Sequence, residues 1–379
     1  MRKTRRTAIG CGLAAALAGG TVLLAGAAGA RGGNPPGTSA VALAAVGPAA
    51  ASPGTAMKGA ASQAAAPAYP TFVTLPGDQA AHPGFENEWW YVVGHVTADG
   101  HVFGYEVQII ARSDVDGTTE PLTPAEAIVA ITDVTTGQYV SQVFQYDPGQ
   151  GTFSSAALDE STPNATLSGP LNAMRLQASM PAGSVDLTLD ARGPAIYNGG
   201  NGLIPFLAGS SYYYSLPTVS TTGTLVEGGR AYQVNGQSWV DHQWGDWNWL
   251  VTQKWTWMGI QLSDGVSVDL WDIFSSGTED HYATVLEPDG TEHIVAVEPL
   301  ASRTSGFVTS PTTGQRYGSQ WRVVIPALHA SLTVRAIPEL QEIQALGGIY
   351  EGDAAVTGEY GGRPVTGLAY AEQLGDWHS

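Results

Sequence analysis

The sequence predicts an all-β protein, built as two antiparallel β-barrels or sandwiches in tandem, from three observations. Charged residues make up only 13% of the 379 residues, whereas Gly, at 48 residues, is abundant. This composition favours strands over helices. The second observation is a set of residue pairs that separate alternating or apolar runs and supply the positive φ of two-residue hairpin turns. These pairs are Asp99-Gly100, Gly228-Gly229, Asp289-Gly290 and Gly361-Gly362.

The third observation is an internal repeat. Each copy has the pattern of a strand, an Asp-Gly turn and a second strand, and the offset of 165 residues is about the length of a small domain. We therefore expect an N-terminal β domain at residues 71–222 and a C-terminal β domain at residues 223–379. The matching residues are Trp90 with Trp255, Gly94 with Gly259, Asp99 with Asp264, and Gly100 with Gly265.

The N-terminus is typical of an export signal. A basic start is followed by an apolar stretch over residues 7–27 and by small residues that suit cleavage after Ala30. The Arg5-Arg6 pair also fits twin-arginine export. Residues 31–70 are rich in Ala, Gly and Pro and predict a disordered linker. The expected location is secreted or extracytoplasmic, with no stable membrane insertion once residues 1–30 are removed.

Charge and cysteine content exclude several classes of function. The net charge is −18, and the signal removes four of the 16 basic residues and none of the 34 acidic ones. Such a surface repels nucleic acid, so no nucleic-acid partner is expected. Cys11 is the only cysteine and leaves with the signal, which excludes disulfides and thiolate sites from the mature chain. Metal, phosphate-loop and nucleophile-elbow motifs are absent, so no cofactor and no metal are expected.

The segment Gln237-Ser-Trp-Val-Asp-His-Gln-Trp-Gly245 places an acid and an imidazole between two indoles. In an extended strand Trp239 and Asp241 face one side, while His242 and Trp244 face the other. Two interpretations of Asp241 stay open. It is either a general acid kept protonated in an aromatic cavity, because desolvation raises the pKa of a carboxyl group, or a turn cap beside a structural histidine.

Three further segments supply candidates. Glu88 is either the second carboxylate of an acid/base pair or an edge carboxylate at a strand start. Consecutive tyrosines put hydroxyls on both faces of a strand, for substrate binding or domain packing. Indoles at alternate positions line either a cavity or a core. The catalytic candidates are Asp241, His242 and Glu88. The substrate-binding candidates are Trp89, Trp90, Tyr91, Tyr212, Tyr213, Tyr214, Trp239, Trp244, Trp255, Trp257 and Trp271.

Four blocks resemble the AttH-like, lipocalin-like family, which includes carotenoid 1,2-hydratases (hydroxyneurosporene synthases), kievitone hydratase and lipocalin-like Diels–Alderases. They are Glu88-Trp-Trp-Tyr91, Ser211-Tyr-Tyr-Tyr214, Gly236–Gly245 and Ile349–Tyr370. The resemblance implies two lipocalin-like barrels with an apolar ligand site near their junction. It also implies Asp241 as proton donor, with His242, Glu88 and the tyrosine run in supporting roles.

The expected function is an exported, cofactor-independent hydro-lyase of the carotenoid 1,2-hydratase type. It would protonate and hydrate an alkene of a hydrophobic, isoprenoid-like small molecule. Alkene protonation needs an acid kept neutral until use, and indole and phenol faces stabilise the resulting cation. Two alternatives remain: a cyclase-type, Diels–Alderase-like catalyst that mainly orients its substrate, and a non-catalytic lipocalin-like carrier of an apolar ligand.

Overall fold

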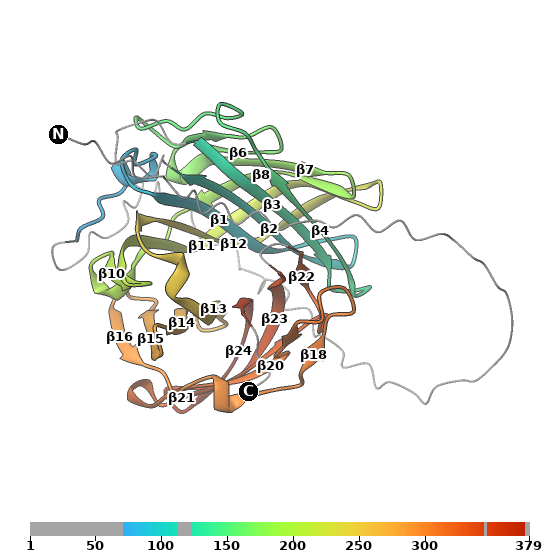
Figure 1. The fold of residues 1–379 in the computed structure, drawn as a ribbon. Helices are drawn as coiled ribbons and strands as arrows, with labels where there is room; N and C mark the ends of the chain where they lie inside the picture. Colours follow the sequence, from blue (N-terminus) through green and yellow to red (C-terminus); the bar gives the residue numbers. More distant parts are fainter. Residues whose placement is uncertain (1–70, 113–122, 345–346, 376–379) are drawn as a thin grey trace, which may run out of the picture. The chain divides into compact units, whose positions relative to one another are not determined.

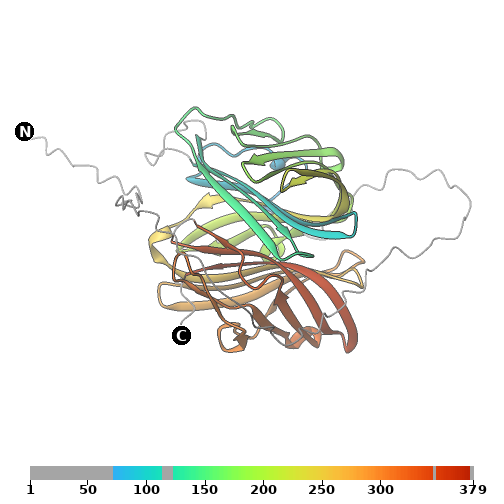
Figure 2. The same cartoon turned by 90° about the vertical axis from the view of Figure 1, so that its right-hand side faces the viewer.

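The computed structural model describes residues 71–112, 123–344 and 347–375, and their regular structure is almost entirely antiparallel β-sheet (Figures 1 and 2). The all-β prediction is therefore confirmed. The predicted signal and linker, residues 1–70, lie outside the described residues. Among the described residues, no helix combines the length and apolar character that a membrane span requires.

The N-terminal sheet consists of β1 (Asn87–Ala98), β2 (His101–Arg112), β3 (Thr123–Asp133), β4 (Gln138–Gln145), β5 (Asp159–Ser161), β6 (Ala165–Ser168), β7 (Met174–Met180), β8 (Gly183–Ala191), β9 (Ile196–Tyr197), β10 (Leu203–Phe206), β11 (Gly209–Glu227) and β12 (Arg230–Asp246).

The C-terminal sheet consists of β13 (Thr252–Leu262), β14 (Ser267–Ser275), β15 (Thr278–Leu286), β16 (Glu292–Ala296), β17 (Thr304–Ser305), β20 (Gln320–Ile325), β21 (Ala330–Ala336), β22 (Glu342–Ile343), β23 (Ile349–Tyr360) and β24 (Arg363–Leu374). A separate pair is formed by β18 (Val308–Thr309) and β19 (Arg316–Tyr317). Short 3-10 turns are η1 (Gly77–Gln79), η2 (Leu171–Ala173), η3 (Asn198–Gly200), η4 (Trp249–Val251), η5 (Ala301–Arg303) and η6 (Pro326–Leu328).

The two sheets repeat one topology. The first runs β4-β3-β2-β1-β12-β11-β8-β7 and the second runs β16-β15-β14-β13-β24-β23-β21-β20 along the matching path. The first strand of each, β1 or β13, forms a hairpin with the next strand and also pairs with the last long strand of its sheet, β12 or β24. The two halves therefore share one strand order, although Trp90 of β1 packs inside the N-terminal sheet, whereas Trp255 of β13 packs between the sheets.

The change of sheet comes later than the predicted division at residue 223. That position lies inside β11, and β11 and β12 together form the longest hairpin of the N-terminal sheet. The chain enters the second sheet only between Asp246 and Thr252. The Gly228-Gly229 turn lies inside the first sheet, because β12 must return across it to pair with β1.

Three of the predicted two-residue turns join neighbouring strands, and both central residues have positive φ. The values are 51° and 83° at Asp99-Gly100, and 57° and 80° at Gly228-Gly229. At Gly361-Gly362 they are 57° and 74°. This is the backbone conformation of a type I′ turn, in which glycine has no steric cost.

Three hydrophobic cores follow from the alternation of side chains along the strands. One core lies inside the curl of the N-terminal sheet, drawn blue to yellow in Figure 1, and another inside the orange-to-red C-terminal sheet. The third lies between the sheets and is dominated by aromatic rings, among them Tyr91, Trp239 and Trp257. The candidate site is built into this third core.

Polar contacts also join the sheets. His95 Nε2 of β1 lies 2.9 Å from Asp353 Oδ1 of β23, and both side chains are buried. Burial lowers the pKa of His95, but the charge and hydrogen bond of Asp353 outweigh it and raise the pKa overall. Thr132 of β3 donates a 2.9 Å hydrogen bond to Gln341. Asp353 can approach β2 because residue 104 is glycine.

Substituting Gly104 by alanine is expected to loosen this contact between the sheets. The new Cβ would lie 2.0 Å from Asp353 Oδ2, and Asp353 is held in place by His95. We expect a loss of about 1–3 kcal/mol in the free energy of unfolding, measured by denaturant titration. Gly77→Ala is the control, because a Cβ there meets no atom within 4 Å. Equal midpoints for the two variants would contradict the described contact.

Candidate active site

Asp241 lies at a cavity between the two sheets. Along β12, Trp239, Asp241 and Gln243 face the core between the sheets, as expected for an extended strand. The cavity has a volume of about 70 Å³. At roughly 10–15 Å³ for each water-sized molecule, it has room for about five. Six of the predicted substrate-binding residues line it with Asp241, namely Trp89, Tyr91, Tyr213, Trp255, Trp257 and Trp271.

The carboxyl group of Asp241 forms a hydrogen-bonded chain with Tyr213 and Asp269. The Tyr213 hydroxyl oxygen lies 2.8 Å from Asp241 Oδ2 and 2.9 Å from Asp269 Oδ2. A phenol has one hydrogen and can donate to only one of these oxygens. The other contact requires a carboxyl group that donates to the phenol oxygen. At least one of the two aspartates is therefore protonated.

The surrounding donors decide which aspartate holds the proton. Asp269 Oδ2 accepts hydrogen bonds from Ser215 at 2.8 Å and Asn198 at 3.2 Å, and its Oδ1 accepts from Trp257 Nε1 at 3.1 Å. Burial raises the pKa of Asp269 to about 6, although these hydrogen bonds stabilise the ionised form and lower the pKa. Burial and the charge of Asp269 raise the pKa of Asp241 well above its ordinary value. Asp241 is therefore the protonated partner.

Trp239 completes the surroundings of Asp241. Its Nε1 donates a 2.6 Å hydrogen bond to Asp241 Oδ1, the oxygen that the phenol does not contact. Trp239 belongs to the core between the sheets without lining the cavity itself. The acid is thus held in one orientation by an indole on one oxygen and a phenol on the other. Such a fixed, desolvated carboxylic acid is suited to donate a proton.

A second pair of acids lines the same cavity. Glu351 of β23 and Glu372 of β24 are direct neighbours across the two strands. Burial, with the charges of nearby glutamates, raises the pKa of Glu351 well above its ordinary value, and Tyr91 donates a 2.8 Å hydrogen bond to it. Burial raises the pKa of Glu372 to about 7, although hydrogen bonds from Trp255 and Glu351 lower it. Glu372 therefore changes protonation near neutral pH.

Two polar groups of the cavity wall have no partner among the described residues. The side-chain amide of Gln243 is fully buried and neither of its polar atoms is hydrogen-bonded. The Nε1 atom of Trp271 is likewise unpartnered. A buried amide without a partner is costly, so a bound polar group or water at this position would be stabilised.

The other predicted residues lie on the opposite face of β1, β11 and β12. Glu88 and His242 are buried inside the N-terminal sheet, where their side chains meet at 2.7 Å. His242 follows Asp241 in β12, and neighbouring residues of a strand point to opposite faces. His242, and Glu88 which it contacts, therefore do not share a pocket with Asp241. The predicted pairing of Glu88 with Asp241 is therefore corrected. Four predicted substrate-binding residues are on this face as well and do not line the cavity: Trp90, Tyr212, Tyr214 and Trp244.

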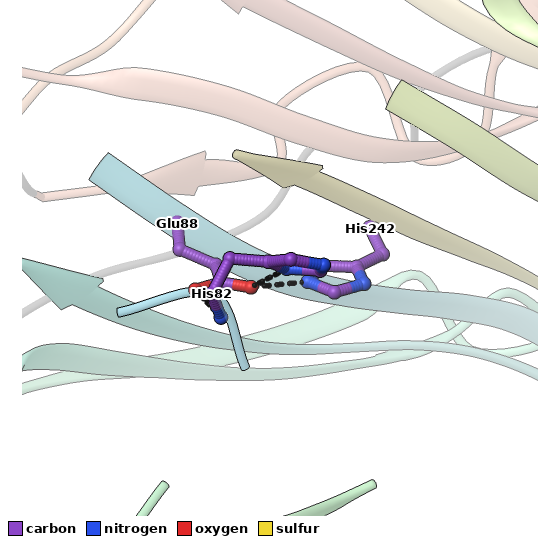
Figure 3. Close-up of side chains that lie close together, drawn as sticks. All are labelled: His82, Glu88 and His242. Carbon is purple, nitrogen blue, oxygen red and sulfur yellow. Dashed lines mark hydrogen bonds and ion pairs between the residues drawn. The ribbon is translucent and has the colours of Figure 1, made fainter. Parts of the chain in front are cut away.

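Glu88 and His242 form a compact group with His82, from the segment before β1 (Figure 3). Burial raises the pKa of Glu88, but its close contacts with His242 and His82, and the charges that these rings carry when protonated, lower the pKa below the ordinary value overall. Burial lowers the pKa of His242, against the opposing effect of Glu88. One carboxylate and two imidazoles converge here, and they are also a set of ligands that could hold a metal ion.

The residues that the sequence analysis did not select as candidates are Asp269, Glu351, Glu372 and His82. Glu351 and Glu372 lie in largely apolar stretches, Ile349-Tyr-Glu-Gly and Ala369-Tyr-Ala-Glu. An acid at the position of a buried side chain, one or two residues from a tyrosine or indole, was the available signal. His82 gave no signal, because its partners are distant in sequence and no local spacing joins them.

The duplicated, curled sheets with an acid-bearing aromatic cavity between them define a lipocalin-like two-sheet protein. A family model described as AttH-like matches residues 66–376. The chain therefore belongs to the AttH-like family. Its fold is similar to that of a candidate AttH protein from Nitrosomonas europaea, with a TM-score of 0.69 at 21% identity, covering 83% of this chain and 99% of that one.

Two named relatives are enzymes of water addition or removal. The chain is 27% identical to Dehydratase asqC of Emericella nidulans over 213 residues, which are 52% of this chain and 60% of the relative. It is 25% identical to Kievitone hydratase of Fusarium solani subsp. phaseoli over 207 residues, 51% of this chain and 58% of the relative. The matches thus span less than two thirds of each relative's length.

Proposed function

We propose that this protein is a hydro-lyase that adds water to, or removes it from, a carbon–carbon double bond of a hydrophobic, isoprenoid-like small molecule. The names of the two relatives support the reaction class. The single observation that carries the proposal is the Tyr213 hydroxyl between Asp241 and Asp269, which requires a protonated carboxyl group in an indole-lined cavity. Such a group is what alkene protonation needs.

In the hydration direction the proton of Asp241 forms a new C–H bond with the less substituted alkene carbon. The positive charge that develops on the other carbon faces the rings of Trp257 and Trp271, which stabilise it through cation–π attraction. A water molecule then forms the C–O bond and gives its proton to Glu372. Proton exchange with solvent restores both acids, so the net change is the addition of one water. Dehydration follows the same steps in reverse.

The dimensions and polarity of the cavity fit the reacting end of such a molecule. Room for about five water-sized groups suits a branched alkene terminus together with one water. The unpartnered amide of Gln243 offers a hydrogen bond to this water or to the product hydroxyl. We further propose that the enzyme acts outside the cytoplasm, on the basis of the predicted signal at residues 1–30.

Incubation of the purified protein with prenylated aromatic compounds in oxygen-18-labelled water tests this function. The expected result is a product heavier than the substrate by one labelled water, detected by mass spectrometry. Saturable binding without any product would assign the protein as a carrier. A rearranged product of unchanged mass would assign it as a cyclase-type catalyst. Either result would overturn the proposed hydration.

A further inference from the structure

We propose that His82, Glu88 and His242 bind one divalent transition-metal ion, with Zn²⁺ the best match, inside the N-terminal sheet. The group lies on the face of β12 opposite Asp241, so the proposal is independent of the proposed hydro-lyase activity. Two imidazoles and one carboxylate form a familiar zinc donor set that leaves a further position for water.

The three side chains converge on one point (Figure 3). His82 Nδ1 lies 2.8 Å from Glu88 Oε1, and His242 Nε2 lies 2.7 Å from the same oxygen. All three ligand atoms lie within 4.8 Å of one another. Ligand atoms around a tetrahedral zinc ion are separated by about 3.3 Å, given bonds of about 2.0 Å. Each histidine nitrogen therefore needs to lie about 0.5 Å farther from Glu88 Oε1 to admit the ion.

A count of hydrogens shows that a neutral His242 and an ionised Glu88 do not by themselves account for their short contact. His242 Nδ1 lies 3.0 Å from the backbone oxygen of Asp78, an atom that can only accept, so Nδ1 carries the hydrogen of a neutral ring. Nε2 then presents a lone pair to the carboxylate of Glu88, which is also an acceptor. Two acceptors at 2.7 Å repel unless a cation or an additional proton lies between them.

The contacts that the two histidine rings make outside the group are of the kind that orient metal ligands. In metal sites the second ring nitrogen of a ligating histidine usually donates to a carbonyl or carboxylate oxygen, as His242 Nδ1 does to Asp78. The rings are also fixed by stacking: His82 lies on Trp244 at a centroid distance of 3.8 Å, and His242 lies on Trp90 at 4.7 Å. Rings held in this way are already oriented for an ion.

A neighbouring acid, Glu160, is neutral near pH 7 because burial raises its pKa to about 9, so the negative charge of the group comes from Glu88. Glu160 is fully buried and its Oε2 atom has no partner among the described residues. The site is reachable, because the His82 side chain keeps 18% of its surface exposed. A bound ion would tie the segment before β1, through His82, to strands β1 and β12 at one end of the N-terminal sheet.

Calorimetric titration of the chelator-treated protein with Zn²⁺ tests the proposal. We expect one ion per chain, and at least about 100-fold weaker binding after His82→Gln, since loss of even an outer contact costs 10–100-fold. The matched control is His101→Gln. His101 pairs with one carboxylate, Asp133, at the same 2.8 Å and with 24% of its side chain exposed, but has no second histidine. This control should bind zinc as the wild type does.

Co²⁺ provides a second measurement that does not depend on the stability of a variant. The cobalt-loaded wild type should show the intense visible absorption of a four-coordinate site, and stoichiometric Zn²⁺ should abolish it. Failure of the wild type to bind either ion would overturn the proposal, as would unchanged zinc affinity in His82→Gln. If no ion binds, nitrogen NMR showing His242 with both ring nitrogens protonated would identify a proton as the missing charge.

Discussion

Replacement of Asp241 by asparagine is expected to reduce turnover on the order of 10³-fold while ligand binding is retained. General acids contribute about 10²–10⁴-fold to rates, and Asp241 is the protonated acid that an indole and a phenol hold in one orientation at this cavity. Asparagine has the shape of a protonated aspartate. Its oxygen can accept from Trp239 and its NH₂ can donate to Tyr213, so both contacts of Asp241 survive. The measurement is kcat together with the dissociation constant of a substrate.

Asp272→Asn is the matched control for this substitution. Asp272 is also fully buried on β14, and burial raises its pKa to about 6, but it accepts from the backbone of Leu300 on the other face of the strand and does not line the cavity. Its variant should keep wild-type kcat. Wild-type turnover in Asp241→Asn would remove Asp241 from the mechanism and leave an orienting role for the cavity.

Asp241→Asn is also expected to raise the stability of the folded protein at neutral pH. The folded pKa of Asp241 is raised, so at neutral pH the native state binds a proton that the unfolded chain has released. Stability therefore falls as the pH rises from about 4 toward the folded pKa. Asparagine does not titrate and escapes this loss. Asp241→Asn should unfold at a higher temperature than the wild type at pH 7, and the difference should shrink toward pH 4.

Much of the fold could be predicted because its signals are local. Alternation along strands, paired turn residues and the 165-residue repeat each depend on a few neighbouring residues. The division between the sheets was placed too early, because only the length of the repeat, about that of a small domain, was used to place it. The offset also separates the starts of the two sheets, since β1 begins at Asn87 and β13 at Thr252.

The site was predicted less completely, because it is assembled from distant strands. Alternation correctly separated Asp241 from His242, but nothing local could show which face of β1 would meet Asp241. Glu88 was therefore considered as a partner of Asp241, whereas it lies on the face of the sheet that carries His242. Glu372, which does share the cavity, lies more than a hundred residues from Asp241 and is brought there by β24, the strand of the second sheet that corresponds to β12.

The two acid pairs, Asp241 with Asp269 and Glu351 with Glu372, each combine a protonated acid with one that titrates. In each pair one carboxyl group is held protonated, while burial places the pKa of the other near the physiological range, about 6 for Asp269 and about 7 for Glu372. Asp269 has four hydrogen bonds from protein groups, which stabilise its charge and limit its basicity. Glu372 borders the cavity directly and is the better base for a bound water.

Glu372→Gln is therefore expected to lower the rate of hydration by about 10²-fold or more and to change its dependence on pH. The wild-type kcat/KM for hydration requires ionised Glu372 and protonated Asp241. Because the pKa of Glu372 is about 7, the rate should rise about tenfold per pH unit below 7 and level off above it. Glutamine cannot titrate, so the residual rate of the variant should show no inflection in this window.

Glu106→Gln is the control that tests whether the effect of Glu372→Gln comes from loss of the base or from a change among the buried acids around it. Glu106 is a fully buried neighbour that interacts with Glu372, its pKa is raised well above the ordinary value by burial, and it does not line the cavity. Glutamine resembles its protonated form, so the plateau rate and the inflection near pH 7 should both persist. An inflection that survives in Glu372→Gln would assign the titration to another group, with Asp269 the next candidate because its pKa is about 6.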